Sequence, residues 1–240
     1  MLNPVPVATA LSHRVISQTG PDLVIAIYGR DFAQNSVVRL NGYNLATTYV
    51  TSSVLQARIT SAQRQGVGGV IITVFSPAPG GGSSSGHVLA KANFSDPKNI
   101  VSRHSGKAID LAGGSIDDNA KIQQWDYSKS NQNQHWYLIP TGRSLEFWIV
   151  SARSNKCLTV LSANNGTSLV QRSCDFGNWQ RFRVEEAGRH LLSGKYYSIQ
   201  SVAYLGQALD VSNWSKENGA VIHIWRYGGG ANQQWYIRTP

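Results

Sequence analysis

An internal repeat in residues 97–240 constrains this 240-residue chain more than any other sequence feature. Asp110 precedes Trp125 by 15 residues in the first copy, and Asp210 precedes Trp225 by the same interval in the third. Units of about 50 residues built from short strands cannot bury their apolar faces alone. Three of them therefore predict an all-β architecture with pseudo-threefold symmetry. The aligned segments are Gly106–Leu111, Ile122–Tyr127 and Asn133–Trp136 in the first copy, Asn155–Val160, Leu169–Cys174 and Trp179–Phe182 in the second, and Gly206–Val211, Ile222–Tyr227 and Asn232–Trp235 in the third.

A Gln-X-aromatic triplet closes each copy, at Gln134–Trp136, Gln180–Phe182 and Gln233–Trp235. Because the triplet recurs in register with the Asp and the Trp in the middle of the repeat, residues 97–240 resemble the ricin B-type β-trefoil lectins. The resemblance implies a β-trefoil that binds sugars, often galactose or N-acetylgalactosamine. Such domains are often accessory modules of a secreted glycosidase or toxin. We therefore expect residues 99–240 to form a β-trefoil lectin domain.

The two complete copies contain the side-chain types that sugar binding requires. A hexose is bound by a charged acceptor for its hydroxyl groups, an amide that both donates and accepts, and an aromatic ring for its C–H face. By resemblance, the Asp and Asn bind two neighbouring hydroxyls, the Trp stacks on the sugar, and the Gln of the triplet supports the site. The alternative is that the Asp is a turn former, the Trp belongs to the core and the Gln residues are structural. The predicted sugar-binding residues are Asp110, Gln123, Trp125, Asn133 and Gln134 in the first copy, and Asp210, His223, Trp225, Asn232 and Gln233 in the third.

His223 stands in the third copy where the first copy has Gln123. An isolated histidine is more often a surface or hydrogen-bonding residue than a ligand contact. If His223 does contact sugar, the affinity should vary near pH 6.5 (roughly the ordinary histidine pKa).

The second copy departs from the pattern at every expected sugar contact. Thr159 replaces the Asp, Arg172 replaces the Trp, and Trp179 replaces the Asn. The copy keeps the triplet Gln and its aromatic residue. We therefore expect it to be structural, with a different ligand at Arg172 and Trp179 as the open alternative.

The chain has two cysteines, Cys157 and Cys174, and their number alone does not show whether they pair. Both lie in the second copy, where the ricin B-type resemblance implies a disulfide within the repeat. The aligned positions of the first copy are Ala108 and Tyr127, a small residue facing a large ring that can fill the same space. A disulfide would indicate an oxidising compartment.

Residues 1–90 have a different composition, with short β-branched runs separated by turn residues. Strands at this spacing favour an antiparallel β-sandwich, and Asn41-Gly42 predicts a hairpin turn. The Gly- and Ser-rich residues 77–86 form no phosphate loop, because no Lys-Ser/Thr follows, and we expect a loop between the last two strands. The expected strands include residues 23–28, 36–40, 54–59 and 69–75.

This first segment resembles the IPT/TIG family of immunoglobulin-like domains. The resemblance lies in Asn3–Pro6, Leu23–Phe32, Val38–Gly42, and the strand 69–75 followed by Pro79–Ser83. It implies a spacer or interaction module without catalytic residues. We expect a domain over residues 1–90 and a linker over residues 91–98.

Charge and hydropathy exclude several function classes. The formal net charge is +9, but the basic residues are scattered rather than clustered, which argues against nucleic-acid binding. No apolar run reaches the length of a membrane span, about 18 residues. The first four residues lack the basic start and apolar core of a signal peptide, so we expect the chain to be a trimmed or interior piece of a secreted protein.

Catalysis is not expected. Glycoside hydrolysis needs two carboxyl groups at one bond, whereas Asp110 and Asp210 belong to different copies. The six histidines show no metal-ligand spacing, and there is no Gly-X-Ser-X-Gly motif. We expect no metal and no cofactor.

Three functions therefore remain for the trefoil. The first is a carbohydrate-binding module of a larger glycan-active protein that carries a catalytic or toxin domain. The second is a free-standing agglutinin or toxin-targeting subunit. The third is a protein–protein interaction module that has lost sugar binding. Glycans or polysaccharides are the expected partners in the first two.

Overall fold

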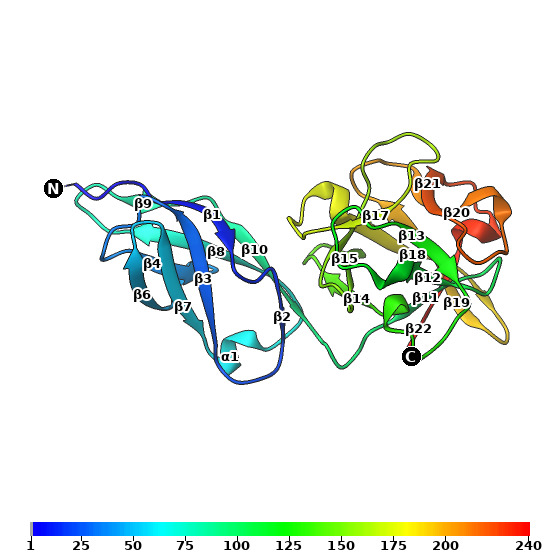
Figure 1. Cartoon of the computed structure of the whole chain (residues 1–240), viewed down its shortest axis with the longest axis horizontal. Helices are drawn as coiled ribbons and strands as arrows, with labels where there is room; N and C mark the ends of the chain where they lie inside the picture. The colour runs from blue at the N-terminus through cyan, green and yellow to red at the C-terminus, as the bar shows by residue number, and fades with distance from the viewer. Residues whose placement is uncertain (1) are drawn as a thin grey trace. The chain divides into compact units, whose positions relative to one another are not determined.

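The computed structural model describes residues 2–240, which form two compact units (Figure 1). The first unit ends at Asn93, and the second runs from Phe94 to Pro240. Both ends of the predicted linker, residues 91–98, belong to these units. Residues 91 and 92 complete a strand of the first unit, and Lys98 forms a β-bridge with Trp136 in the second.

The first unit consists of short strands and a single helical turn between two of them. Thr60 caps this turn, because its hydroxyl accepts a hydrogen bond from the Gln63 backbone N–H while the Gln63 side chain accepts one from the Thr60 backbone N–H. No helix in residues 2–240 is both long and apolar enough to cross a membrane. The elements are β1 (Val7–Leu11), β2 (Val15–Ser17), β3 (Leu23–Arg30), β4 (Val37–Leu40), β5 (Tyr43–Asn44), β6 (Ala46–Thr51), β7 (Val54–Ile59), α1 (Ser61–Arg64), β8 (Gly68–Ser76), β9 (Gly82–Ser83) and β10 (His87–Ala92).

Two sheets enclose the core of the first unit. One has the order β1-β3-β7-β6 and the other β2-β10-β8-β4-β5, with β9 paired to β8. Apolar residues of both sheets, such as Ile25 and Ile72, join one buried cluster. The pairing is not wholly antiparallel as expected, because β2 and β10 run parallel. β10 is the last strand of the unit in chain order, and it lies beside β2.

The predicted hairpin turn at Asn41-Gly42 is confirmed. It joins β4 to β5, and Leu40 pairs with Tyr43 across the turn. Both turn residues have positive φ angles, 49° for Asn41 and 88° for Gly42, the conformation that selects Asn-Gly in tight hairpins. The glycine-rich segment is the expected loop between β8 and β10, with β9 inside it.

Four strands recur in each repeat of the second unit, and a short 3-10 segment precedes the last strand each time. The elements are β11 (Asn99–Ser102), β12 (Ala108–Leu111), η1 (Ala112–Gly114), β13 (Ile122–Trp125), η2 (Gln132–Gln134), β14 (Trp136–Pro140), β15 (Glu146–Ser151), β16 (Cys157–Thr159), β17 (Val170–Arg172), η3 (Asn178–Gln180), β18 (Arg181–His190), β19 (Gly194–Ser201), β20 (Gln207–Val211), η4 (Ser212–Trp214), β21 (Ile222–Arg226), η5 (Ala231–Gln233) and β22 (Trp235–Arg238).

Six of these strands close a barrel. Antiparallel pairs join β11 to β22, β22 to β19, β19 to β18, β18 to β15, and β15 to β14, and the Lys98–Trp136 bridge returns from β14 to the start of β11. The other six form the hairpins β12–β13, β16–β17 and β20–β21, which bridge one another at Lys121–Val170, Gln123–Val221 and Ser168–His223. A six-stranded barrel with a triplet of hairpins is a β-trefoil, so the predicted pseudo-threefold architecture is confirmed.

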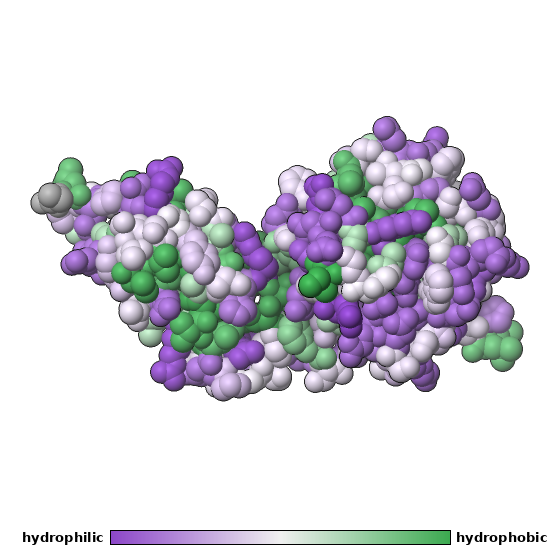
Figure 2. All heavy atoms as spheres, viewed as in Figure 1, coloured by the Kyte–Doolittle hydropathy of each residue, from purple (hydrophilic) through white to green (hydrophobic). Residues whose placement is uncertain are grey.

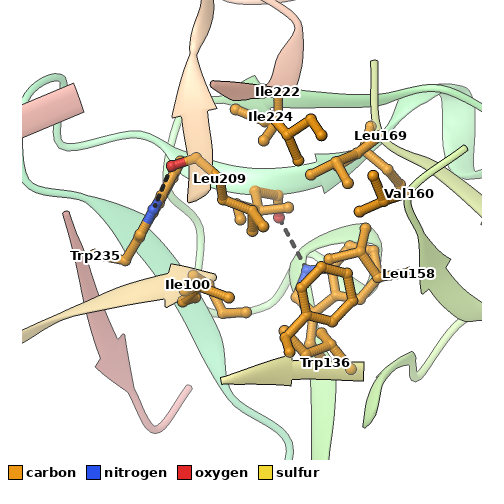
Figure 3. Close-up of a cluster of buried hydrophobic side chains, with 14 of the residues drawn as sticks. Ile100, Trp136, Leu158, Val160, Leu169, Leu209, Ile222, Ile224 and Trp235 are labelled. Carbon is orange, nitrogen blue, oxygen red and sulfur yellow. Dashed lines mark hydrogen bonds between the residues drawn. The ribbon is translucent and has the colours of Figure 1, made fainter. Parts of the chain in front are cut away.

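The three repeats share one apolar core, as the pattern predicted (Figure 3). The aromatic residues of the triplets, Trp136, Phe182 and Trp235, are fully buried in it. The Trp136 indole N–H donates to the Ile109 carbonyl at 3.1 Å, and that of Trp235 donates to the Leu209 carbonyl at 3.3 Å. On the surface, hydrophilic and hydrophobic side chains are interspersed over the visible face of each unit (Figure 2).

Candidate functional site

The third repeat forms a pocket around Asp210, at the end of β20. The carboxylate is 5% exposed and accepts hydrogen bonds from His223 Nε2 at 3.0 Å and Asn232 Nδ2 at 2.8 Å. A carboxylate offers about four lone-pair positions, so acceptor capacity is left for a ligand. The pocket has a volume of ≈ 390 Å³, within the range of about 300–1,000 Å³ typical of small-molecule sites.

Trp225 provides an aromatic wall of this pocket. Its ring is 44% exposed and stacks against the His223 ring, with the centroids 5.6 Å apart. The edge of the indole lies close to Gly166, which belongs to the second repeat and has a φ of 85°. An added Cβ at Gly166 would lie 3.8 Å from the ring, so the second repeat borders this wall, while the residues that line the pocket all belong to the third repeat.

The pocket also contains Trp214, which the sequence pattern did not identify. Trp214 belongs to η4, just after β20, and its ring is 54% exposed. It aligns with Gly114 of the first repeat, so the position shows no recurring residue type. The sequence signal for this residue was a single tryptophan four residues after the predicted Asp210. A search for repeated motifs does not detect a residue that occurs in one copy.

The first repeat places Asp110 in the corresponding position, at the end of β12. Gln123 and Gln134 each donate to its carboxylate at 3.2 Å, and Asn131 donates at 3.3 Å. Burial raises the pKa of Asp110, and these three hydrogen bonds oppose the rise. Trp125 is 43% exposed, as Trp225 is in the third repeat.

The predicted Asn133 differs from its counterpart Asn232. Asn232 donates to Asp210, whereas Asn131 is the asparagine that donates to Asp110. The Asn133 side chain lies instead against Gly114. A Cβ added to Gly114 would lie 2.8 Å from the Asn133 Oδ1 atom. The first repeat thus has two asparagines near the carboxylate, and sequence alignment alone does not reveal which one bonds to it.

The triplet glutamines Gln134, Gln180 and Gln233, which we call the clamp glutamines, have one role in common. Each is buried, accepts from a backbone N–H of the loop after the middle strand, and donates to a backbone carbonyl of the same loop. The corresponding N–H to Oε1 distances are 2.9, 2.9 and 2.7 Å. The clamp glutamines therefore fix the loop, and only Gln134 also bonds to the predicted ligand-binding aspartate.

The second repeat has other residues at the expected sugar contacts, and each of them bonds to another protein group. Thr159 accepts from the amide of Gln180 at 3.1 Å, and Arg172 donates to Asn119 at 2.7 Å. Trp179 donates to Asp175 at 3.0 Å. Asn119 occupies the position that Gly166 has beside Trp225, so a side chain stands where the third-repeat wall has a glycine beside it.

The two cysteines are joined, as the resemblance implied. The Cys157–Cys174 disulfide links β16 to the loop after β17. In the first repeat, Ala108 is fully buried and Tyr127 packs against its cluster. A small residue with a ring thus fills the space of the disulfide in that repeat.

The side chains of these sites offer hydrogen bonding and stacking. Asp110 and Asp210 are contacted by amides and an imidazole, and no second carboxylate among the described residues bonds to either of them. No group of three or more His, Cys, Asp or Glu residues in the described part of the chain is placed to bind a metal ion.

Comparison with known proteins agrees with this geometry. The family model described as ricin-type β-trefoil lectin domain-like matches residues 90–172 and 178–240. The search of curated proteins found no match. Among solved structures, the designed threefold-symmetric protein ThreeFoil is 35% identical, with a TM-score of 0.53, and the match covers 59% of this chain and 96% of that protein.

Two further solved structures are similar. An exo-β-1,3-galactanase from Clostridium thermocellum is 19% identical over 98% of this chain and 57% of its own, with a TM-score of 0.57, a likeness of fold alone. The C-half of the earthworm R-type lectin, solved in complex with GalNAc, is 24% identical over 60% of this chain and 99% of its own, with a TM-score of 0.49. Because the family model covers more than half of the chain and matches the three repeats described above, the chain belongs to the ricin-type β-trefoil lectin domain-like family through residues 90–240.

Proposed function

We propose that the chain is a carbohydrate-binding protein that takes galactose-type sugars, galactose or N-acetylgalactosamine, at two sites. The observation that carries the proposal is the buried Asp210–Asn232 pair beneath the half-exposed ring of Trp225, in a pocket of ≈ 390 Å³. The first repeat offers a second site with Asp110 and Trp125. Family membership supports the same function.

The chemistry of galactose suits this arrangement. Its axial hydroxyl leaves adjacent C–H groups together on one face of the ring, where an indole can stack. The Asp210 carboxylate accepts from two neighbouring hydroxyls, and a charged acceptor makes stronger hydrogen bonds than a neutral one. Asn232 holds the carboxylate in place and offers its amide oxygen to a hydroxyl donor.

Each site binds weakly by itself, because a monosaccharide buries little surface. Two sites on one chain gain through effective concentration when the target carries several sugars. The protein therefore binds polysaccharides or clustered glycans more tightly than free sugar. We propose that it acts as a binding module rather than as an enzyme.

The test is calorimetric titration with methyl β-galactoside and with a galactose-bearing polymer. The unmodified protein should bind two equivalents of the monosaccharide, and the Asp110→Ala/Asp210→Ala variant should bind none. Glu217→Ala is the matched control, because its side chain is exposed and no hydrogen bond joins its carboxylate to the described residues. Unchanged binding by the double variant would refute the site assignment, and failure across a broad sugar panel would favour a protein–protein module.

The presence of two sites also supports a second candidate, an agglutinin or toxin-targeting subunit. A chain with two sugar sites crosslinks cells that display the sugar. Agglutination of red cells by this chain, inhibited by free galactose, would favour this candidate over an accessory module. Loss of agglutination in either single aspartate variant would show that both sites take part.

For the first unit, we propose an IPT/TIG-type immunoglobulin-like domain that serves as a spacer. The two sheets around one core and the Asn-Gly hairpin support this assignment. We also propose that the protein is secreted, with a larger parent that carries a catalytic or toxin domain. The Cys157–Cys174 disulfide supports an oxidising compartment.

A further inference from the structure

The loop after the aspartate strand has the same backbone conformation in the first and third repeats, with different residues. Gly113 and Gly114 have φ angles of 63° and 62°, and the aligned Asn213 and Trp214 have 55° and 52°. Glycine adopts positive φ without steric cost, whereas a bulky residue there is strained. Backbone strain of this kind concentrates at ligand sites. The third repeat therefore keeps a tryptophan where the backbone favours glycine.

The strained backbone places the Trp214 ring in the sugar pocket. The ring lines the same ≈ 390 Å³ pocket as Asp210 and Trp225. A Cβ added at Gly230 would lie 2.5 Å from the Asn232 Oδ1 atom and 3.0 Å from the Trp214 ring, so the glycine leaves room for Asn232 first and also for the ring. In the first repeat the corresponding residue at the start of the 3-10 segment is Asn131.

The two repeats thus differ at two aligned positions. The third repeat combines Trp214 with Gly230, and the first combines Gly114 with Asn131. In the first repeat the Asn131 amide bonds to the Asp110 carboxylate, and no aromatic residue stands at position 114. Of these two aromatic positions, the first repeat therefore has Trp125 alone, whereas the third has both Trp214 and Trp225.

A neighbouring residue of the first repeat also fixes Trp214. His104 Nε2 donates to the Trp214 carbonyl at 2.7 Å. The two rings meet edge to face, with centroids 5.1 Å apart. The Trp214 ring is therefore positioned in advance and does not need to be ordered by the ligand, which lowers the entropic cost of binding.

We propose that Trp214 forms a second subsite of the third-repeat pocket and stacks on the sugar that follows the terminal galactose-type residue, so that this site takes a disaccharide end while the first takes a single sugar. The inference rests on the proposed function. One sugar ring needs one stacking platform, which Trp225 provides, and the pocket of ≈ 390 Å³ extends beyond a single pyranose ring. A disaccharide uses both platforms.

The experiment compares methyl β-galactoside with lactose at each site alone. Asp110→Ala removes the first site, so that binding at the third can be measured alone. Asp210→Ala removes the third site, so that binding at the first can be measured alone. The measured quantity is the ratio of the two dissociation constants by calorimetry. We expect lactose to bind about three- to tenfold more tightly than the monosaccharide at the third site, as one added stacking contact gives, and equally well at the first.

Trp214→Gly in the Asp110→Ala background is the decisive variant. Glycine suits the positive φ of this residue, so the variant should fold, and circular dichroism checks this. We expect its ratio to fall to that of the first site, and Leu205→Ala, an exposed side chain in the same repeat, to leave the ratio unchanged. A third site without lactose preference, or a preference that survives in Trp214→Gly, would overturn the proposal. Absence of binding of either sugar at both isolated sites would instead refute the proposed function.

Discussion

The second and third repeats fold around the same framework but have different side chains where a ligand would bind. Gln180 and Gln233 hold equivalent loops, and Phe182 and Trp235 fill equivalent places in the core. The third repeat leaves Asp210 with free acceptor capacity. The second repeat has no carboxylate at that position, and its side chains there bond to other protein groups, among them Asn119 of the first repeat.

The difference shows that framework and ligand residues are separable in this trefoil. One position illustrates this: Gly219, Gly166 and Asn119 all have positive φ and lie beside the residue in the middle of a repeat. Where the residue is glycine, a tryptophan wall stands beside open space. Where it is Asn119, the side chain bonds to Arg172. The hairpins β12–β13, β16–β17 and β20–β21 form in all three repeats, so the framework does not depend on the ligand set.

Removal of the disulfide should give the largest change in the free energy of unfolding, because the disulfide is a covalent link that the second repeat has and the third lacks. Cys157→Ala/Cys174→Ala should lower the free energy of unfolding by about 3 kcal/mol, the value for a closed loop of about 15 residues. Cys157→Ala/Cys174→Tyr introduces the pair that the first repeat has at Ala108 and Tyr127. It should recover part of the loss, because the ring fills the vacated space.

Urea unfolding monitored by tryptophan fluorescence measures both variants. The unmodified protein under reducing conditions is the control for the loss of the covalent link alone. If the Ala/Tyr variant is no more stable than the Ala/Ala variant, the equivalence of disulfide and ring between the repeats is wrong.

The clamp glutamines should give the next largest effect. Gln180→Ala leaves the backbone N–H groups of Asp175 and Phe176 without their acceptor. Unpaired buried polar groups of this kind cost about 1–3 kcal/mol. Gln233→Ala should cost a similar amount for the same reason.

Calorimetric sugar titration of the same two variants separates framework from site. We expect Gln233→Ala, once shown to be folded, to retain binding at the third site, because its amide is used by the loop. A folded Gln233→Ala protein that has lost sugar binding would show that Gln233 supports the site, the role that the sequence pattern predicted. Gln180→Ala is the matched control, since its repeat has no ligand set.

The sequence predicted those features that repeat or depend on the local chain. The fold follows from the period of the three copies, and the Asn41-Gly42 turn follows from its local backbone requirement. Trp214 was missed, because it occurs in one copy and a comparison of repeated residue types does not detect it. The parallel pairing of β2 and β10 was missed for a related reason, since pairing between distant segments leaves no local pattern.

The pairing of an asparagine with Asp110 shows the same limit on a smaller scale. Alignment favoured Asn133, which matches Asn232. The donor is Asn131, which caps the 3-10 segment at the position where the third repeat has Gly230, a residue without a side chain. Residue types could be predicted from sequence at this site, whereas the partner of each carboxylate depends on loop geometry.

The smallest expected effect is a pH dependence at the first site. Burial raises the pKa of Asp110 above its ordinary value of 3.8. Sugar hydroxyls donate to the ionised carboxylate, so binding at the first site should weaken on acidification while the pH is still above 3.8. Calorimetric titration of the Asp210→Ala protein with methyl β-galactoside at a series of pH values measures this.

The effect of pH on the stability contribution of Asp110 has the opposite sign to its effect on sugar affinity. A raised pKa means that the folded state binds more protons than the unfolded state between pH 3.8 and the raised value. The contribution of Asp110 therefore falls as the pH rises through this interval, because a charge must then be kept in a buried place. In Asp110→Asn this component of the pH dependence should be absent, as urea unfolding at several pH values would reveal. If the sugar affinity of the first site stays constant down to pH 3.8, or if Asp110→Asn has the same stability profile as the unmodified protein, Asp110 is not the buried acceptor of that site.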